Sequence, residues 1–297
     1  MQAMLFAAGL GSRLRPLTDR NPKPALLVGD RPLVAYAIDV LKRGGVTHIV
    51  ANTHHLPDKM SAVLRAHCPA SIRLDISHEP ILLGTAGGLR RAWDRYFDRE
   101  RPVLVYNGDI LFEPDLRALM LSHERENHFA TMTLRISESA SMYGEVRARD
   151  GNVISILGEP ETKSGESTVT MFTGVHLLSA SAMQTLPERG CVVRDGYMKW
   201  LRVGRPVGAH VVDAPFEDLG TLDRYFRANM DTASEQSQIA PSATIGQGTT
   251  ITECVIGERA LIGPDLTLRR AVVLPDANVQ KSLENAIVSD SAIVQIP

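Results

Sequence analysis

The feature that most constrains the fold is a six-residue repeat of aliphatic residues near the C-terminus. Seven positions keep this period, apart from one step of five residues between Ile251 and Ile256. The seven positions are Ile239, Ile245, Ile251, Ile256, Ile262, Leu268 and Leu274. A chain that buries one side chain on each face of a prism stacks its turns, so the repeat predicts a β-solenoid of about two to three coils. An ordinary all-β tail is the alternative.

A solenoid of this size has a small core and leaves an apolar end with unpaired strand edges. We therefore expect it to pack on the rest of the chain or on a neighbouring subunit, and we expect a homo-oligomer. The polar stretch 232–238 predicts a linker before the solenoid. This gives a larger domain over residues 1–231 and a short solenoid domain over residues 239–297.

The residues before the linker alternate between strand and helix patterns. Strands are predicted at 4–8, 48–51, 72–76 and 103–106, and helices at 32–42, 58–67 and 85–97. This alternation predicts an α/β fold with a doubly wound, Rossmann-like sheet. Alternating strand patterns within 130–180 predict an antiparallel extension of that sheet.

Composition narrows the class of protein. The formal net charge of −2 over 297 residues gives no support for nucleic-acid binding. Three widely spaced cysteines argue against a disulfide framework and for a reducing compartment. Since no stretch approaches about 20 apolar residues, we expect a cytoplasmic protein without a membrane partner.

The segment 4–24 combines an apolar strand, a glycine turn and positive charge. Gly9 and Gly11 let the backbone approach a ligand, and Arg13, Arg15 and Lys23 suit a polyphosphate. The dinucleotide fingerprint and the Walker loop are both excluded, because position 14 is leucine and G-K-[ST] is absent. A basic surface loop is the alternative.

Two acidic residues could hold a metal ion. Asp109 follows the strand at 103–106, where open α/β sheets bind their ligands. Paired with a second carboxylate, it would make an oxygen-rich Mg²⁺ site, and Asp218 is the candidate. For Asp109 alone, an ordinary turn aspartate is the alternative.

Four separated motifs together resemble those of the sugar-1-phosphate nucleotidylyltransferases. Residues 9–24 match the signature G-x-G-[ST]-R-x-x-P…P-K-P, and residues 79–88 match the loop E-x-x-L-G-T-A-G. Residues 108–109 match the strand-end G-D, and residues 218–221 match D-[ILT]-G-T before the last helix of the catalytic domain. The resemblance covers residues 1–230, and the solenoid resembles the hexapeptide repeats of left-handed β-helices, a common family appendage.

The resemblance implies an enzyme that transfers a nucleotidyl group from an NTP to a sugar 1-phosphate and releases pyrophosphate. The implied catalytic residues are Arg13, Lys23, Asp109 and Asp218, of which the two aspartates hold Mg²⁺. The implied nucleotide-binding residues are Ala7, Ala8, Gly9, Gly11, Ser12, Arg13, Lys23, Glu79, Gly84, Thr85 and Ala86. The implied sugar-phosphate-binding residues are Asn107, Tyr143, Gly144, Glu159, Lys163, Thr173 and Gly174.

The loop 79–88 bears on the choice of nucleotide. Its glycines leave backbone amides and carbonyls free to pair with a planar base. The Glu79 carboxylate accepts hydrogen bonds and cannot donate, so it suits the adjacent N–H donors of guanine better than the single donor of uracil. This points to GTP, although Glu79 could equally be a structural partner. Thr85 could equally cap the helix that follows.

The sugar-phosphate side departs from the family pattern. Residues 143–146 match Y-G-x-V and residues 172–175 match [NT]-[AT]-G-[IV], but the usual E-K-P lysine is absent at 158–160. We expect Lys163 or Arg147 to take its place.

Several substrates and one other class of function remain open. GTP with mannose 1-phosphate or a heptose 1-phosphate is the first expectation. UTP with glucose 1-phosphate or N-acetylmuramic acid 1-phosphate is the alternative. The missing lysine also suggests a catalytically silent paralogue that binds an NDP-sugar and regulates a partner subunit. An acyltransferase activity of the solenoid is disfavoured, because it has few coils and lacks a histidine after residue 210.

Overall fold

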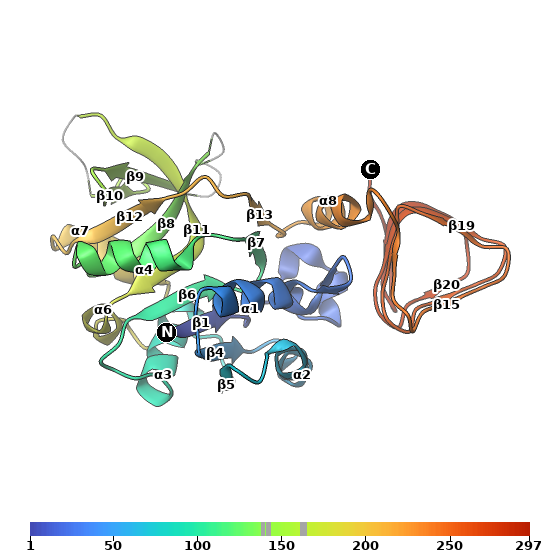
Figure 1. The fold of residues 1–297 in the computed structure, drawn as a ribbon, viewed down its shortest axis with the longest axis horizontal. Coiled ribbons are helices and arrows are strands. Elements are labelled where there is room, and N and C mark those ends of the chain that lie inside the picture. The colour runs from blue at the N-terminus through green and yellow to red at the C-terminus, as the bar shows by residue number, and fades with distance from the viewer. Residues whose placement is uncertain (138–139, 141–143, 161–164) are drawn as a thin grey trace.

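The computed structural model describes residues 1–137, 140, 144–160 and 165–297. Figure 1 shows a larger α/β body and, beside it, a three-sided coil formed by the C-terminal residues. Helix α8 (Leu222–Ala233) lies between the two. Among the described residues, no helix has the length and apolar character needed to cross a membrane.

A nine-stranded mixed sheet forms the centre of the larger body. Its strands are β1 (Gln2–Phe6), β4 (His48–Thr53), β5 (Arg73–His78), β6 (Val103–Asn107), β8 (Ala130–Ile136), β9 (Glu145–Arg149), β10 (Asn152–Ile156), β11 (Thr168–Leu178) and β12 (Val207–Val211). They lie in the order β5-β4-β1-β6-β11-β8-β12-β10-β9. The first four are parallel, whereas β11 runs antiparallel to both β6 and β8. The predicted antiparallel extension is therefore confirmed.

Helices cover both faces of this sheet, as the alternating sequence pattern predicts. One face packs against α1 (Leu33–Arg43), α2 (Pro57–His67) and α4 (Leu116–Arg125). The other face packs against α3 (Gly84–Arg95), α6 (Ala180–Gln184) and α7 (Met198–Arg202). Side chains alternate along β1. Ala3 and Leu5 therefore pack in the core on the α1 face of the sheet, and Met4 packs in the core on the α3 face.

The first strand ends earlier than the apolar run predicts. Strand β1 stops at Phe6, whereas the prediction extended it to Ala8. The reason is that the chain leaves the sheet at Ala7, whose N–H donates to the side-chain Oδ1 of Asn52 at 2.9 Å. The strand therefore ends where the glycine turn begins.

Short elements at the carboxyl ends of the sheet strands position the candidate site. Three 3₁₀ turns span Ser12–Leu14, Leu17–Asp19 and Lys23–Ala25, and a π-helical turn spans Val192–Tyr197. The short strands are β2 (Leu27–Val28), β3 (Arg31–Pro32), β7 (Ile110–Phe112) and β13 (Phe216–Asp218). Strand β13 pairs antiparallel with β7, which sets Asp218 opposite Ile110. This pairing brings Asp218 next to the end of β6.

The C-terminal coil consists of short strands that stack in parallel, except that the last strand runs antiparallel to the one before it. They are β14 (Gln238–Ile239), β15 (Thr244–Ile245), β16 (Thr250–Thr252), β17 (Val255–Ile256), β18 (Leu261–Ile262), β19 (Thr267–Val273), β20 (Asn278–Val279), β21 (Leu283–Val288) and β22 (Ile293–Gln295). Val272 pairs with Ile287, 15 residues on, whereas Gln238 pairs with Val255 and Val255 with Val272, so the first three turns are 17 residues apart. This offset equals two steps of six residues and one of five, which is the spacing of the aliphatic anchors. Figure 1 shows the resulting three-sided outline.

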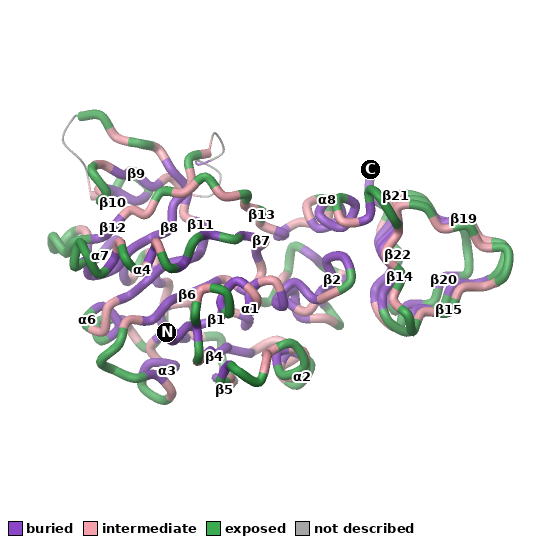
Figure 2. Tube along the Cα trace, viewed as in Figure 1, coloured by how far each residue is buried: buried purple, intermediate pink, exposed green. Residues whose placement is uncertain are grey.

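One side of the coil packs against the larger body. A buried cluster joins Val255, Val272 and Ile287 of the coil to α8 residues such as Phe226 and to Leu14 of the glycine-turn segment. Figure 2 shows buried residues on the side of the coil that faces α8 and exposed residues on the far side. The expectation that the coil packs on the rest of the chain is therefore confirmed.

Candidate functional site

Two cavities open at the carboxyl ends of β1 and β6. The first, of about 460 Å³, lies beside the glycine turn, and the second, of about 330 Å³, lies beside β11. The residues that line both are Phe6, Arg13, Thr85, Asn107 and Asp109. The two cavities are therefore neighbours that share a wall, which is an arrangement suited to two substrates.

Lys23 lies at the centre of the acidic pair that the sequence predicts. Its side chain is 7% exposed, and its Nζ lies 2.8 Å from Asp109 Oδ2 and 3.4 Å from Asp218 Oδ1. The structure thus gathers three predicted catalytic residues around one point, although they come from distant parts of the sequence. An ammonium between two carboxylates reduces their mutual repulsion.

Arg13, the fourth predicted catalytic residue, lies on the wall shared by both cavities. A Cβ on Gly220 would lie 2.6 Å from Arg13 Nη2 and 3.0 Å from Asp218 Oδ1. The glycine of the D-[ILT]-G-T motif therefore leaves room for the guanidinium beside Asp218. The other carboxylate oxygen of Asp218 lies 3.6 Å from Arg224 Nη1.

The glycine turn forms one wall of the first cavity. Gly11 has φ +62°, and a Cβ there would lie 2.9 Å from the Thr18 methyl carbon. Its carbonyl accepts hydrogen bonds from the Leu14 N–H at 2.9 Å and from the Thr18 hydroxyl at 2.9 Å. Of the predicted nucleotide-binding residues in this segment, Ala8, Gly9, Gly11, Ser12, Arg13 and Lys23 line the cavity. Ala7 is buried behind it.

Glu79 is fully buried at the floor of the first cavity. Its Oε1 accepts a hydrogen bond from Asn52 Nδ2 at 2.8 Å, and its Oε2 accepts one from the Leu83 N–H at 3.0 Å. A Cβ on Gly88 would lie 2.7 Å from Glu79 Oε1, so this glycine makes room for the carboxylate. These bonds fit the structural alternative for Glu79. Asn52 is not among the predicted site residues, because its signal in the sequence is no more than a polar side chain at the end of a buried strand.

The other glycines of the loop accommodate a distant backbone segment. Gly84 has φ +75°, and a Cβ there would lie 2.4 Å from the carbonyl oxygen of Gly190. That carbonyl accepts a hydrogen bond from the Ala86 N–H at 2.9 Å. The Thr85 hydroxyl accepts one from the Val192 N–H at 2.9 Å. Thr85 therefore anchors this segment and does not cap α3, which begins at Gly84.

The second cavity is built around a bulge in β11. The register with β8 shifts between Phe172 and His176, and Gly174 within the bulge has φ +83°. A Cβ on Gly174 would lie 2.3 Å from Asn107 Nδ2, so the bulge packs directly on that side chain. The Thr173 hydroxyl donates to the carbonyl of Thr133 at 2.9 Å. The remaining walls are mostly apolar and include Ile110, Phe172, Val192, Val193 and Phe216.

A buried histidine that is not among the predicted site residues also lines the second cavity. His176 is 1% exposed, and its Nδ1 lies 2.7 Å from the Tyr197 hydroxyl. Burial lowers the pKa of His176 to about 3, so its imidazole is neutral near pH 7. Burial also raises the pKa of the Tyr197 hydroxyl. A single histidine in an apolar strand carries no sequence signal of this kind.

The predicted sugar-phosphate residues are divided by the structure. Asn107, Thr173 and Gly174 line the second cavity. Gly144 and Glu159 line neither cavity, and Glu159 forms an ion pair with Arg202. Tyr143 and Lys163 lie outside the described residues.

The basic residue that would replace the missing lysine is not found in β9. Arg147 lines neither cavity, and its Nε donates to Glu145 Oε1 at 2.6 Å. Arg13 is the one lysine or arginine among the described residues that lines the second cavity. Which residue holds a sugar phosphate therefore stays a prediction.

The two carboxylates fit a magnesium site. Mg²⁺ is usually held by one or two carboxylates together with substrate phosphates, and Asp109 and Asp218 converge on the Lys23 ammonium between the cavities. Within the described part of the chain, no group of three or more His, Cys, Asp or Glu residues could hold a metal ion. The donor set therefore suits an ion that takes its other ligands from substrate and water.

A family model described as nucleotidyl transferase matches residues 2–235. This chain therefore belongs to the nucleotidyl transferase family. The family that the four motifs indicate, the sugar-1-phosphate nucleotidylyltransferases, and the predicted enzyme class are thereby confirmed.

Named proteins and a solved structure that are similar to this chain agree with this family assignment. Over 99% of its length the chain is 28% identical to "Probable mannose-1-phosphate guanylyltransferase 1" of Oryza sativa subsp. japonica, of which it covers 86%. It is 27% identical to the UTP–glucose-1-phosphate uridylyltransferase of Synechocystis sp., over 77% of this chain and 62% of that protein. The crystal structure of HddC from Yersinia pseudotuberculosis complexed with GMP-PN matches with a TM-score of 0.64 and 22% identity, covering 77% of this chain and 98% of that one. At this identity the structural match concerns the fold.

Proposed function

We propose that this enzyme transfers a guanylyl group from GTP to mannose 1-phosphate or a heptose 1-phosphate and releases pyrophosphate. The observation that carries the proposal is the gathering of Lys23, Asp109 and Asp218 where two cavities meet. The first cavity, beside the glycine turn, would take the nucleotide, and the second, beside β11, the sugar 1-phosphate. The name of the rice relative supports the choice of GTP and mannose 1-phosphate.

In this proposal the chain acts by positioning and charge neutralisation. The sugar-phosphate oxygen attacks the α-phosphorus in line, and pyrophosphate leaves on the opposite side. Lys23 neutralises the α-phosphate, and Arg13 neutralises the departing phosphates. No general base is needed, because the attacking phosphate is already anionic. Asp109 and Asp218 would hold Mg²⁺, which when bound supplies further positive charge to the phosphate oxygens.

The nucleotide and sugar can be tested together. The purified chain is incubated with each of four NTPs and a panel of sugar 1-phosphates in the presence of Mg²⁺ and inorganic pyrophosphatase. Phosphate is then detected with malachite green. We expect the greatest turnover with GTP and mannose 1-phosphate or a heptose 1-phosphate. A preference for UTP with glucose 1-phosphate or N-acetylmuramic acid 1-phosphate would support the uridylyltransferase alternative, which the Synechocystis relative favours.

A catalytically silent NDP-sugar-binding subunit is the candidate of another class. The absent E-K-P lysine favours it, whereas the clustered Lys23, Asp109 and Asp218 oppose it. The same assay separates the two, because a silent subunit would release no phosphate with any pair yet would bind an NDP-sugar in calorimetry.

We also propose that the C-terminal coil is a left-handed β-helix and a domain of its own over residues 239–297. The parallel pairing and the offset of 17 residues support this. The handedness and the boundary at the 232–238 linker stay predictions.

A further inference from the structure

One ring nitrogen of His176 has no partner within the described chain. Its Nδ1 lies 2.7 Å from the Tyr197 hydroxyl, whereas its Nε2 forms no hydrogen bond with any described residue. Nε2 is also absent from the buried polar atoms that lack a partner in the described chain. It is therefore accessible to solvent. Because His176 lines the second cavity, it is accessible from that cavity.

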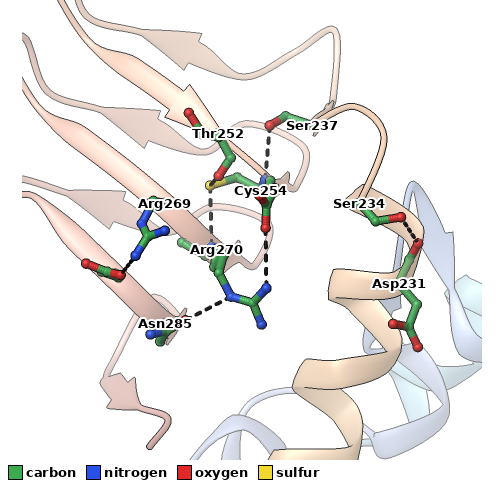
Figure 3. Close-up of polar contacts among 11 residues, drawn as sticks. Asp231, Ser234, Ser237, Thr252, Cys254, Arg269, Arg270 and Asn285 are labelled. Atoms are coloured by element: carbon green, nitrogen blue, oxygen red, sulfur yellow. Dashed lines mark hydrogen bonds and ion pairs between the residues drawn. The ribbon is translucent and has the colours of Figure 1, made fainter.

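Two buried residues away from the site show the usual arrangement, in which the chain itself supplies the hydrogen-bond partner. Cys254 is fully buried in the coil, where its N–H donates to the Ser237 hydroxyl at 3.0 Å and its thiol donates to the Thr252 carbonyl at 3.2 Å (Figure 3). His123 is buried as well, and its Nδ1 lies 2.8 Å from Thr131 Oγ1, but it lines neither cavity. The Nε2 of His176, in contrast, lies where a bound molecule can reach it.

Strand β11 holds this nitrogen in a mostly apolar wall. The bulge ends at His176, which lies opposite Val105 of β6 and Met132 of β8. Its ring meets the ring of Phe172 edge-on, with the centroids 5.3 Å apart. In cavities with apolar walls, a small number of precisely placed polar groups fixes the orientation of the ligand. His176 is therefore placed to determine how a molecule lies in the second cavity.

The contact with Tyr197 determines which nitrogen of His176 carries the proton. Burial raises the pKa of the Tyr197 hydroxyl, so this group keeps its hydrogen, and burial keeps the imidazole of His176 neutral. The hydroxyl has no partner among the described residues other than Nδ1, so its hydrogen would be left unpaired in the interior unless it donates to that atom. Nδ1 is then the acceptor, and the one ring proton of the neutral imidazole is on Nε2.

We propose that the Nε2–H of His176 donates a hydrogen bond to one hydroxyl oxygen of the sugar and thereby selects among sugar 1-phosphates. This hydrogen bond rests on the proposed function, which assigns the second cavity to the sugar 1-phosphate. A site that hydrogen-bonds a substrate hydroxyl rejects an analogue without it, because the buried polar group is then left unpaired. Tyr197 is a positioning residue, since it holds His176 as a donor without lining the cavity.

Analogues of the sugar 1-phosphate test this contact. Mannose 1-phosphate, or whichever sugar 1-phosphate the substrate panel prefers, is compared with monodeoxy analogues that each lack one hydroxyl. In the wild type, kcat/KM should fall at least roughly tenfold when the contacted hydroxyl is missing. In His176→Phe this loss should disappear, because the donor is gone, whereas the losses for the other analogues should persist. Each ratio compares two substrates on one preparation, so a loss of folded protein cancels.

Two further variants separate hydrogen bonding from packing. Tyr197→Phe keeps the ring but removes the hydroxyl that makes Nδ1 the acceptor, so it should weaken the discrimination at the same sugar hydroxyl and at no other. His123→Phe makes the matched exchange at a buried histidine that lines neither cavity, and it should leave every ratio unchanged. If every wild-type loss survived in His176→Phe, the proposal would be overturned.

The position of the ring proton can be measured without turnover. Long-range proton–nitrogen correlation NMR of the isotope-labelled full chain at neutral pH should show the proton of His176 on Nε2, with its signals assigned by their absence from His176→Phe. A proton on Nδ1 would overturn the proposal. Turnover with unchanged ratios would contradict the role of His176 alone, whereas no turnover with any sugar 1-phosphate would contradict the proposed function.

Discussion

The two cavities share a wall but are built from different kinds of residue. Around the first, charged and glycine residues of the sequence motifs gather at the ends of strands, and Lys23 contacts both Asp109 and Asp218. The second is walled mainly by apolar side chains from β11 and from the π-helical turn. Arg13 and Asp109 line both cavities and Asp218 lines the second, so the two differ in the Lys23 ammonium and glycine turn that belong to the first alone and in the β11 bulge that belongs to the second alone. Variants that separate charge from shape can test this difference.

The largest effect is expected from removing the charge at the centre of the site. Lys23→Ala should reduce turnover by at least ~100-fold, because it removes a positioned cation that faces developing phosphate charge. Turnover is measured as pyrophosphate release at saturating substrates. Lys59→Ala is the control, because Lys59 is exposed and its Nζ donates to the Arg20 carbonyl, at 3.0 Å, away from both cavities. Near-wild-type turnover in Lys23→Ala would contradict the assignment of the first cavity.

The buried, neutral His176 in the wall of the second cavity makes the stability of the fold depend on pH. The pKa of His176 is about 3 in the folded chain, against about 6.5 when unfolded. Between these values the unfolded chain binds more protons, so stability is complete above pH 6.5 and falls as the pH decreases. At pH 5 the loss from His176 is about 2 kcal/mol. His123, whose pKa burial lowers to about 4, adds a loss of the same sign.

Substitution isolates the contribution of His176. Gln keeps polar atoms near the Tyr197 hydroxyl but does not titrate, so His176→Gln should reduce the loss of stability between pH 7 and pH 5 by about 2 kcal/mol. Urea unfolding at the two pH values measures it. His78→Gln replaces an exposed histidine and should leave the difference unchanged. If both variants retained the full loss, the acid sensitivity would not come from beneath the second cavity.

The sequence could predict some parts of the site and the coil but not others. Asp109 could be predicted because a carboxylate at the end of an apolar strand stands out against its neighbours, and Asp218 because its segment resembles the family motif D-[ILT]-G-T. The coil could be predicted because an aliphatic anchor recurs at steps of six residues, with one step of five. His176 and Val192 could not, because neither differs from ordinary core residues until the bulge of β11 and the π-helical turn bring them to one wall.

The roles of glycines were predicted less well than their positions. The loop motif predicts that Gly84 and Gly88 expose backbone groups to a base. In the structure they make room for the Gly190 carbonyl and for the Glu79 carboxylate. Such close approaches depend on tertiary packing, and nothing in the local sequence specifies the segment that approaches.

A glycine substitution tests the shape of the second cavity. In Gly174→Ala the new methyl group would meet the Asn107 amide, which would be 2.3 Å away, so the side chain must move. We expect the KM for the sugar 1-phosphate to rise about tenfold, a difference of about 1.4 kcal/mol, with the KM for the NTP unchanged. Gly151→Ala imposes a similar backbone strain at φ +74° with no atom within 4 Å, and should change neither constant. Equal effects on both substrates would mean that the two cavities do not divide the substrates.

The smallest effect is expected where the two cavities are joined. The Thr85 hydroxyl, on the shared wall, accepts the Val192 N–H at 2.9 Å. Thr85→Val keeps the shape of the side chain and removes the acceptor, so stability should fall by about 1 kcal/mol, and Thr85→Ser should restore it. Thr47→Val, at an exposed threonine, serves as the control in denaturant unfolding. Faster amide exchange at Val192 in Thr85→Val alone would show that this bond keeps the π-helical turn against the first cavity, whereas unchanged exchange would mean that the wall is held by packing.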